Sequence, residues 1–147
     1  MTVRFFLVRH GRAQAGHPQG DAARRLLPGG RDELAAHFRA LANELRLVRV
    51  ATSPLVRARE SADILAEVTG APVADEDALA SGESSGAVIL GMGARLGDGT
   101  ALVGHNPELA EAVAVAVGRQ VEVPPGAVAA IDVERGGFRL AWIRAPG

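Results

Sequence analysis

Short apolar runs alternate with longer amphipathic segments along the chain, and this alternation restricts the fold more than any other feature. Brief apolar runs rich in β-branched and aromatic residues are typical of buried strands, whereas apolar residues three and four apart indicate helices. Residues 3–9 (VRFFLVR) are the clearest strand, and 31–47 carries Leu34 and Phe38 at helical spacing. The alternation predicts an α/β fold: a three-layer α/β/α sandwich with a mostly parallel central sheet and helices on both faces.

The remaining elements are predicted from the same pattern and from turn residues. Ser53-Pro54 and Asn106-Pro107 each combine a helix-capping residue with a proline suited to the first helical turn, so we expect a helix after each. Residues 11–28, rich in glycine, proline and charge, are expected to form a long functional loop. The other expected strands are 48–52, 71–74, 100–104 and a terminal hairpin of 126–133 and 138–143; the other expected helices run from 53 to about 68, over 84–96, and from 106 to about 117.

Composition excludes several classes of function. The length of 147 residues predicts one domain spanning 1–147. The chain has no cysteine, which excludes disulfides and thiol catalysis, and all 16 basic residues are arginine, which excludes Schiff-base chemistry. The net charge of −1 argues against a nucleic-acid partner, and the apolar run 5–8 is too short for a signal peptide or a membrane span. We therefore expect no nucleic-acid or membrane partner, and a cytoplasmic monomer is the default expectation.

Residues suited to anion binding follow three of the predicted strands. The triplet RHG ends the first strand, HNP follows the strand 100–104, and an arginine lies in the first turn of the helix after 48–52. Ligand sites in parallel α/β sheets form at the carboxyl ends of strands. If the three strands are neighbours, four side chains converge on one crevice: Arg9, His10, Arg57 and His105.

Two guanidiniums and two imidazoles in one crevice indicate a phosphoryl ligand, because guanidinium forks match phosphoryl oxygens. The sequence shows no carboxylate cluster suited to Mg²⁺, so we expect neither a metal nor an organic cofactor. His10 is the candidate nucleophile: Arg9 and Arg57 should keep its imidazole neutral, and one ring nitrogen should donate to a backbone carbonyl. Gly11 would let the backbone turn tightly beside the phosphate.

Three motifs in this order resemble the histidine phosphatase superfamily, whose fold is phosphoglycerate-mutase-like. They are LVRHG (7–11), SPLVRARESA (53–62) and VGHNP (103–107), and the resemblance covers nearly the whole chain. The short chain and the segment DAARRLLPGG (21–30) resemble the SixA-type phosphohistidine phosphatase branch. The resemblance implies that His10 is the nucleophile. The expected substrate-binding residues are Arg9, Gly11, Arg57, His105 and Asn106.

The general acid is the open part of the predicted site. Larger relatives protonate the leaving oxygen with a carboxylic acid; Glu83 is the candidate here, and a plain loop carboxylate is the alternative. A phosphohistidine phosphatase needs an acid less, because the departing imidazole nitrogen can already carry its proton. Arg12 stands where the family often has an acidic or small polar residue, which alters the charge at the entrance. The remaining polar residues of note are interpreted as surface residues: His17, His37 and Arg59.

The sequence therefore predicts a phosphatase with a histidine nucleophile and a phosphohistidine intermediate. Phosphohistidine in proteins is the expected substrate, because the chain lacks the insertions that enclose a sugar phosphate in larger relatives. Two alternatives stay open: a phosphatase of small phosphorylated metabolites, and a non-catalytic phosphate-binding regulatory module. His10 could also be a buried structural histidine, and His105 could serve only to help cap the helix that follows it.

Overall fold

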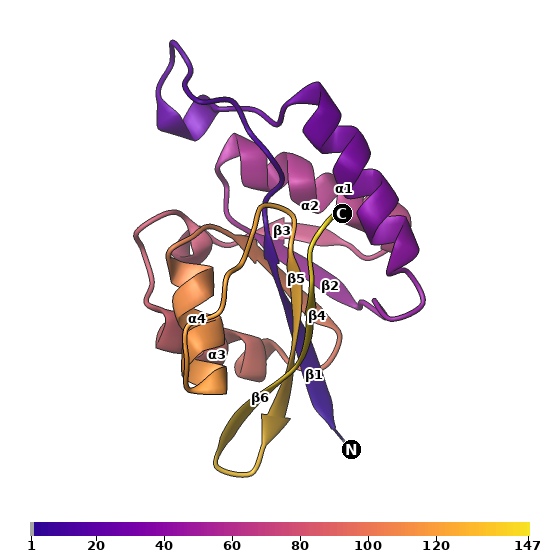
Figure 1. The fold of residues 1–147 in the computed structure, drawn as a ribbon, viewed down its shortest axis with the longest axis vertical. Coiled ribbons are helices and arrows are strands. Elements are labelled where there is room, and N and C mark those ends of the chain that lie inside the picture. Colours follow the sequence, from indigo (N-terminus) through magenta and orange to yellow (C-terminus); the bar gives the residue numbers. More distant parts are fainter. Residues whose placement is uncertain (1) are drawn as a thin grey trace.

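The computed structural model describes residues 2–147, which form one six-stranded sheet flanked by four α-helices (Figure 1). The strands are β1 (Val3–Arg9), β2 (Arg49–Thr52), β3 (Val73–Asp75), β4 (Thr100–Gly104), β5 (Val128–Glu134) and β6 (Gly137–Arg144). The α-helices are α1 (Pro28–Ala40), α2 (Val56–Thr69), α3 (Gly86–Leu96) and α4 (Glu108–Val117). Two short 3-10 helices, η1 (Asp21–Ala23) and η2 (Asp77–Leu79), lie in connecting segments.

The strand order across the sheet is β3-β2-β4-β1-β5-β6. The first four strands in this order pair in parallel, whereas β5 pairs antiparallel with both β1 and β6. Helical crossovers join the parallel strands, because a parallel connection must return the chain to the starting edge of the sheet. The sheet is thus mostly parallel with an antiparallel hairpin at one edge, which confirms the predicted fold class.

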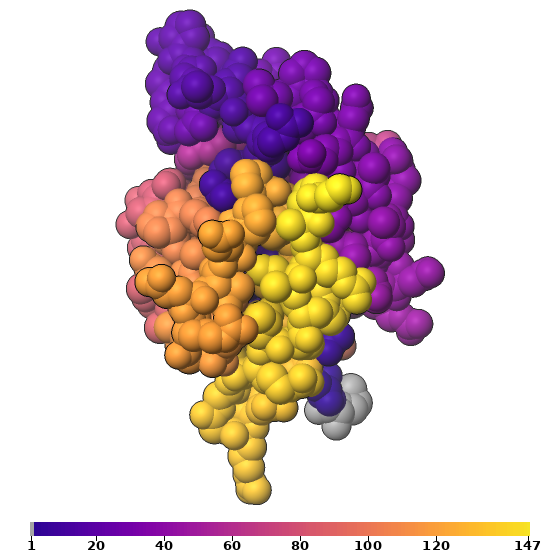
Figure 2. All heavy atoms as spheres, in the orientation of Figure 1, coloured from indigo at the N-terminus to yellow at the C-terminus, as the bar shows by residue number. Residues whose placement is uncertain are grey.

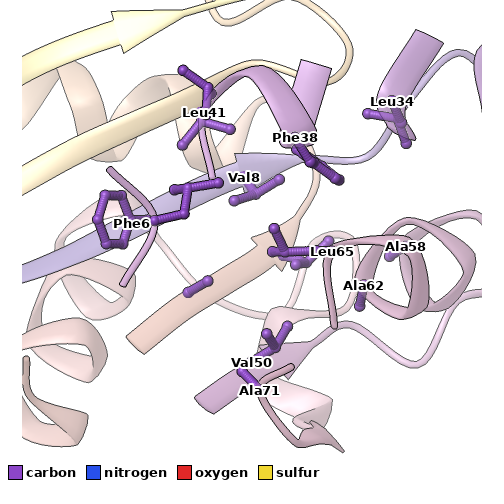
Figure 3. Packing of buried hydrophobic residues seen from close by; sticks show 14 of the residues in the cluster. Phe6, Val8, Leu34, Phe38, Leu41, Val50, Ala58, Ala62, Leu65 and Ala71 are labelled. Carbon is purple, nitrogen blue, oxygen red and sulfur yellow. The ribbon is translucent and has the colours of Figure 1, made fainter. Parts of the chain in front are cut away.

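Successive residues of β1 face opposite sides of the sheet and contribute to two hydrophobic cores. Phe6 and Val8 pack with residues of α1 and α2, among them Phe38 (Figure 3), while Phe5 and Leu7 pack with residues of α3 and α4. A strand that is buried on both faces has no solvent-exposed face, so nearly all of its residues are apolar. The two cores separate the three layers of the sandwich.

Glycines in α3 allow close packing, although they lower the intrinsic helix propensity of the segment. A Cβ on Gly86 would lie 2.4 Å from the backbone nitrogen of Ala112 in α4, and one on Gly93 would lie 2.3 Å from the ring of Phe5. Gly91, by contrast, faces open space. Two of the three glycines that weaken the helix in isolation therefore let it approach α4 and β1.

Element boundaries differ from the predicted ones near turns. The first helix begins at Pro28 and ends at Ala40, because residues 41–44 form a separate turn. The short strand β3 begins after Pro72, which has no amide to donate to the sheet. The helix α2 begins at Val56, so Ser53 does not cap it as predicted. None of the helices in residues 2–147 is long and apolar enough to cross a membrane.

Candidate functional site

The carboxyl ends of β1, β2 and β4 lie level with one another because of the strand register. The paired positions at this edge are Arg9 with Gly104 and Thr52 with Val103. The chain therefore leaves all three strands at the same edge, below the β1–α1 loop (residues 10–27) in Figure 1. In Figure 2, indigo atoms from the early part of the chain reach the surface between this loop and the orange segment that precedes β5.

His10 and His105 meet at this edge, as predicted, with their ring centroids 5.1 Å apart. Both side chains are buried: His10 is 8% exposed and His105 is 3% exposed. The two imidazoles are contributed by neighbouring parallel strands, so the sheet itself sets their separation. The structure thus brings together two residues that are far apart in sequence.

The imidazole of His10 is held by the backbone beside it. Its Nδ1 lies 2.7 Å from the carbonyl oxygen of Gly11, so Nδ1 carries the proton and donates it to that oxygen. Burial lowers the pKa of His10 to about 4, and the positive charges of Arg57 and Arg9 add to the shift. At neutral pH the ring is therefore uncharged, and its Nε2 carries a lone pair. The backbone hydrogen bond and the neutral ring match the prediction from the sequence, but burial, and not the two arginines, is the main cause of the lowered pKa.

Gly11 has a packing role that the sequence did not indicate. A Cβ at this position would lie 2.7 Å from Cδ1 of Leu34, and no positive φ is required here. Its amide donates to Oγ of Ser61 at 3.1 Å, and that hydroxyl donates to the carbonyl of Arg57 at 2.8 Å. The amide is thus engaged within the protein, and the hydroxyl of Ser61 links the end of β1 to the first turns of α2.

The guanidiniums of Arg9 and Arg57 are both anchored by hydrogen bonds to backbone carbonyls. The Nη1 of Arg9 donates to the carbonyl of Val123 at 3.0 Å, and the Nη1 of Arg57 donates to the carbonyl of Asp21 at 2.9 Å. The Nε of each side chain is buried and has no hydrogen-bond partner within residues 2–147. Burial lowers the pKa of Arg9. The two guanidiniums are thus held in fixed orientations near His10, whose pKa their charges lower. Guanidiniums fixed in this way are suited to bind an anion.

Two charged residues of the β1–α1 loop join the site, although the sequence-based prediction did not include them. The carboxylate of Asp21 bridges Arg57, at 3.2 Å from Nη2, and Arg24, at 2.9 Å from Nη1. The charge of Arg24 also lowers the pKa of His10. The only available signal was the resemblance of segment 21–30 to the SixA-type branch, because nothing in the residue spacing indicates that this loop folds back onto α2.

Ser53 contacts His105 instead of capping α2. Its hydroxyl lies 2.7 Å from Nε2 of His105 and accepts a hydrogen bond from the amide of Leu55 at 3.2 Å. Burial lowers the pKa of His105 to about 3, and the neighbouring His10 adds to the shift. The second imidazole of the site is therefore neutral at pH 7 and is oriented by a fully buried hydroxyl.

Asn106 is engaged within the protein, and Glu83 lies on the surface. Both ends of the Asn106 amide are engaged: Nδ2 donates to Val123, and Oδ1 accepts from Ala110 in the first turn of α4, as a cap would. Glu83 is exposed in the loop before α3. The neighbouring Gly82 donates its amide to Glu108, a buried carboxylate at the start of α4. The acid role of Glu83 stays a prediction.

Other polar residues are placed outside the site. Arg59 forms surface ion pairs with Asp63 and Asp75, as predicted. Arg12 forms an ion pair with Glu33 at 3.3 Å, which offsets its charge. Within residues 2–147, no group of three or more histidine and acidic side chains is arranged to hold a metal ion.

Residues 5–84 match the sequence profile of the histidine phosphatase superfamily (branch 1), and the chain belongs to this family. Solved structures with the same fold include a protein provisionally assigned as phosphohistidine phosphatase SixA from Agrobacterium tumefaciens. It is 22% identical, with a TM-score of 0.86 and coverage of 99% of each chain. The protein histidine phosphatase SixA bound to tungstate is 20% identical, with a TM-score of 0.85 and 97% of each chain covered.

A more distant neighbour is a phosphoserine phosphatase from Entamoeba histolytica in complex with 3-phosphoglyceric acid. It is 13% identical, with a TM-score of 0.74, and 97% of this chain and 96% of that chain are covered. Among curated protein sequences, none matches the chain. At these identities the structural neighbours establish the phosphoglycerate-mutase-like fold, and the chemistry must be argued from the site.

Proposed function

We propose that the protein is a phosphatase that uses His10 as its nucleophile and acts on phosphohistidine in proteins. The observation that carries the proposal is the state of His10. Its Nδ1 is committed to the carbonyl of Gly11, its pKa lies far below neutral pH, and it sits beside two guanidiniums. A neutral imidazole with a fixed tautomer has its remaining nitrogen ready to attack phosphorus.

In the first step Nε2 of His10 bonds to phosphorus while the bond from phosphorus to the substrate nitrogen breaks. The substrate imidazole leaves as a neutral ring, because one of its two nitrogens carries a proton. This nitrogen is either the one that was bonded to phosphorus or the other nitrogen of the ring. Arg9 and Arg57 offset the charge on the phosphoryl oxygens as this exchange occurs, and His105 adds a neutral hydrogen-bonding group. The protein supplies positioning and charge stabilisation, which is the main requirement for phosphoryl transfer.

In the second step water attacks the phosphorylated His10. The water oxygen bonds to phosphorus as the bond from phosphorus to Nε2 breaks. Dihydrogen phosphate leaves, and the imidazole returns to its neutral form with the proton on Nδ1. No metal is needed for either step, because the positive charge comes from the side chains around the phosphoryl group.

The substrate class follows from the leaving group. A phosphomonoester releases an alkoxide that requires a strong general acid, whereas an imidazole requires little or no help. The carboxylate at the site, that of Asp21, has its pKa lowered by its hydrogen bond to Arg24, so it is ionised and unsuited to donate a proton. A site with ionised carboxylate and neutral imidazoles favours phosphohistidine over a phosphomonoester.

The proposal is tested by His10→Ala, with His17→Ala as a matched control in the β1–α1 loop. His10→Ala should lower kcat/KM for a phosphohistidine peptide by roughly a thousandfold or more, since the nucleophile is removed. His17→Ala and addition of EDTA should leave the activity unchanged. Rapid quenching of the native protein with labelled substrate should trap acid-labile phosphate on His10. Turnover that survives His10→Ala would refute the mechanism, and faster turnover of small phosphomonoesters than of the peptide would refute the substrate.

A further inference from the structure

A groove of about 720 Å³ begins at Arg9 and runs between α4 and the segment that connects α4 with β5. Figure 1 shows this segment passing along α4 and then rising to the start of β5. Besides Arg9, the walls are formed by Asn106 and Pro107, by three residues of α4, and by Gln120–Pro124. A volume of this size holds a ligand much larger than one imidazole and its phosphoryl group. The groove therefore has room for chain that continues beyond the phosphorylated residue.

The outer wall of the groove offers unpaired backbone groups. Within residues 2–147, the amides and carbonyls of residues 120–122 make no hydrogen bond. The next carbonyl, that of Val123, accepts hydrogen bonds from both Arg9 and Asn106, and these hold the segment in place. A fixed segment with free amides and carbonyls can pair with the main chain of an extended peptide.

The charged residues that line the groove determine which peptide side chains it can bind. Glu122 on the wall opposite α4 and Glu111 on α4 are its acidic groups, and Arg9 is its cation. The carboxylate of Glu111 also accepts a hydrogen bond from the amide of Gly86 at 3.4 Å, so Glu122 is the acidic group with no hydrogen-bond partner within residues 2–147. Arg9 lies at the phosphoryl end, where the phosphate offsets its charge. The rest of the groove is therefore acidic, with apolar contacts from Val121 and Val123. A basic peptide complements this surface, and an acidic one is repelled.

We infer that this groove binds an extended, basic segment of polypeptide adjoining the phosphohistidine of a protein substrate. The inference rests on the proposed function for the identity of the phosphorylated residue. It adds a second contact region to the site, so that recognition depends on the sequence around the phosphohistidine as well as on the phosphoryl group.

The test measures peptide binding in the His10→Ala protein, in which turnover is blocked. The probes are two nine-residue peptides with a central phosphohistidine, one flanked by arginines and the other by glutamates. We expect the arginine peptide to bind about fivefold or more tightly than the glutamate peptide. Glu122→Arg in the same background should remove or reverse this preference, and 0.5 M salt should reduce it. Glu67→Arg, an exposed residue on α2 outside the groove, serves as the charge-matched control and should preserve the preference.

Equal affinity for the two peptides, or a preference that Glu122→Arg does not alter, would overturn the inference. An equal loss with Glu67→Arg would also overturn it, because the effect would then come from net charge. Failure of the proposed function gives a different result: the native protein would hydrolyse neither peptide, whatever their relative affinities. The binding measurement therefore tests whether the groove binds a basic peptide, and the turnover measurement tests the proposed reaction.

Discussion

The most direct prediction concerns the pKa of His10 and is tested by changing the pH. Burial lowers this pKa from 6.5 to about 4, which corresponds to about 3 kcal/mol against the charged ring. At pH 5.5 an ordinary histidine is only about 9% neutral, whereas a ring with the shifted pKa stays about 97% neutral. His10 should therefore keep its neutral form, which the proposed mechanism requires, well into the acidic range.

The assay is an NMR titration of the imidazole ring protons between pH 3 and pH 8, with His10→Asn to assign the His10 signals. We expect the His10 signals to stay constant from pH 8 to about pH 5 and to move only near pH 4. Circular dichroism recorded in parallel shows whether the protein remains folded. A midpoint near 6.5 in the folded protein would refute both the burial argument and the neutral nucleophile.

The same shift links pH to stability. In the unfolded chain the imidazole takes up a proton as the pH falls through 6.5, whereas the folded protein resists protonation until about pH 4. The unfolded state therefore binds more protons in this window. The contribution of His10 to the free energy of unfolding is fully present above pH 6.5 and is lost as the pH falls toward 4, which urea unfolding at a series of pH values measures.

Two further predictions concern a contact in the site and a contact in the core. Ser53→Ala should lower kcat by roughly tenfold through loss of the hydrogen bond that orients His105, while circular dichroism shows that the variant is still folded. An unaltered kcat and an unaltered His105 ring signal would contradict this positioning role. Gly93→Ala should destabilise the protein by about 1–3 kcal/mol, because the added methyl group overlaps the ring of Phe5. The control Gly91→Ala places its methyl group in open space and should be neutral or stabilising by up to about 1 kcal/mol. Equal urea midpoints for the two variants would rule out the overlap.

The sequence predicted the fold well where burial leaves a clear pattern. The strand 3–9 and the strand 100–104 match β1 and β4 at both ends, because both are buried on each face and are bounded by polar residues. Helix ends were less accurate, since capping signals compete. Ser53 precedes a proline as a cap would, yet its hydroxyl bonds to His105 and to an amide before the helix begins.

The strand-end residues of the candidate site could be predicted from the sequence, whereas its loop residues could not. Motifs at strand ends identified the two histidines and two arginines, because the carboxyl ends of parallel strands meet at one edge. Contacts made by Asp21 and Arg24 depend on how a long loop folds back over α2, which no local pattern encodes. The engagement of the Gly11 amide by Ser61 likewise arises from packing between elements that are 50 residues apart in sequence.

One backbone oxygen atom connects Arg9 of the candidate site with the wall of the proposed peptide groove. The carbonyl of Val123 accepts a hydrogen bond from Arg9 at 3.0 Å and one from Asn106 at 3.0 Å. A bound peptide that displaces residues 120–122 would move this oxygen and, with it, the guanidinium of Arg9 that donates to it. Under the proposed function, binding of the flanking chain would therefore affect the position of Arg9, and we expect a poorly matched peptide to lower kcat as well as affinity.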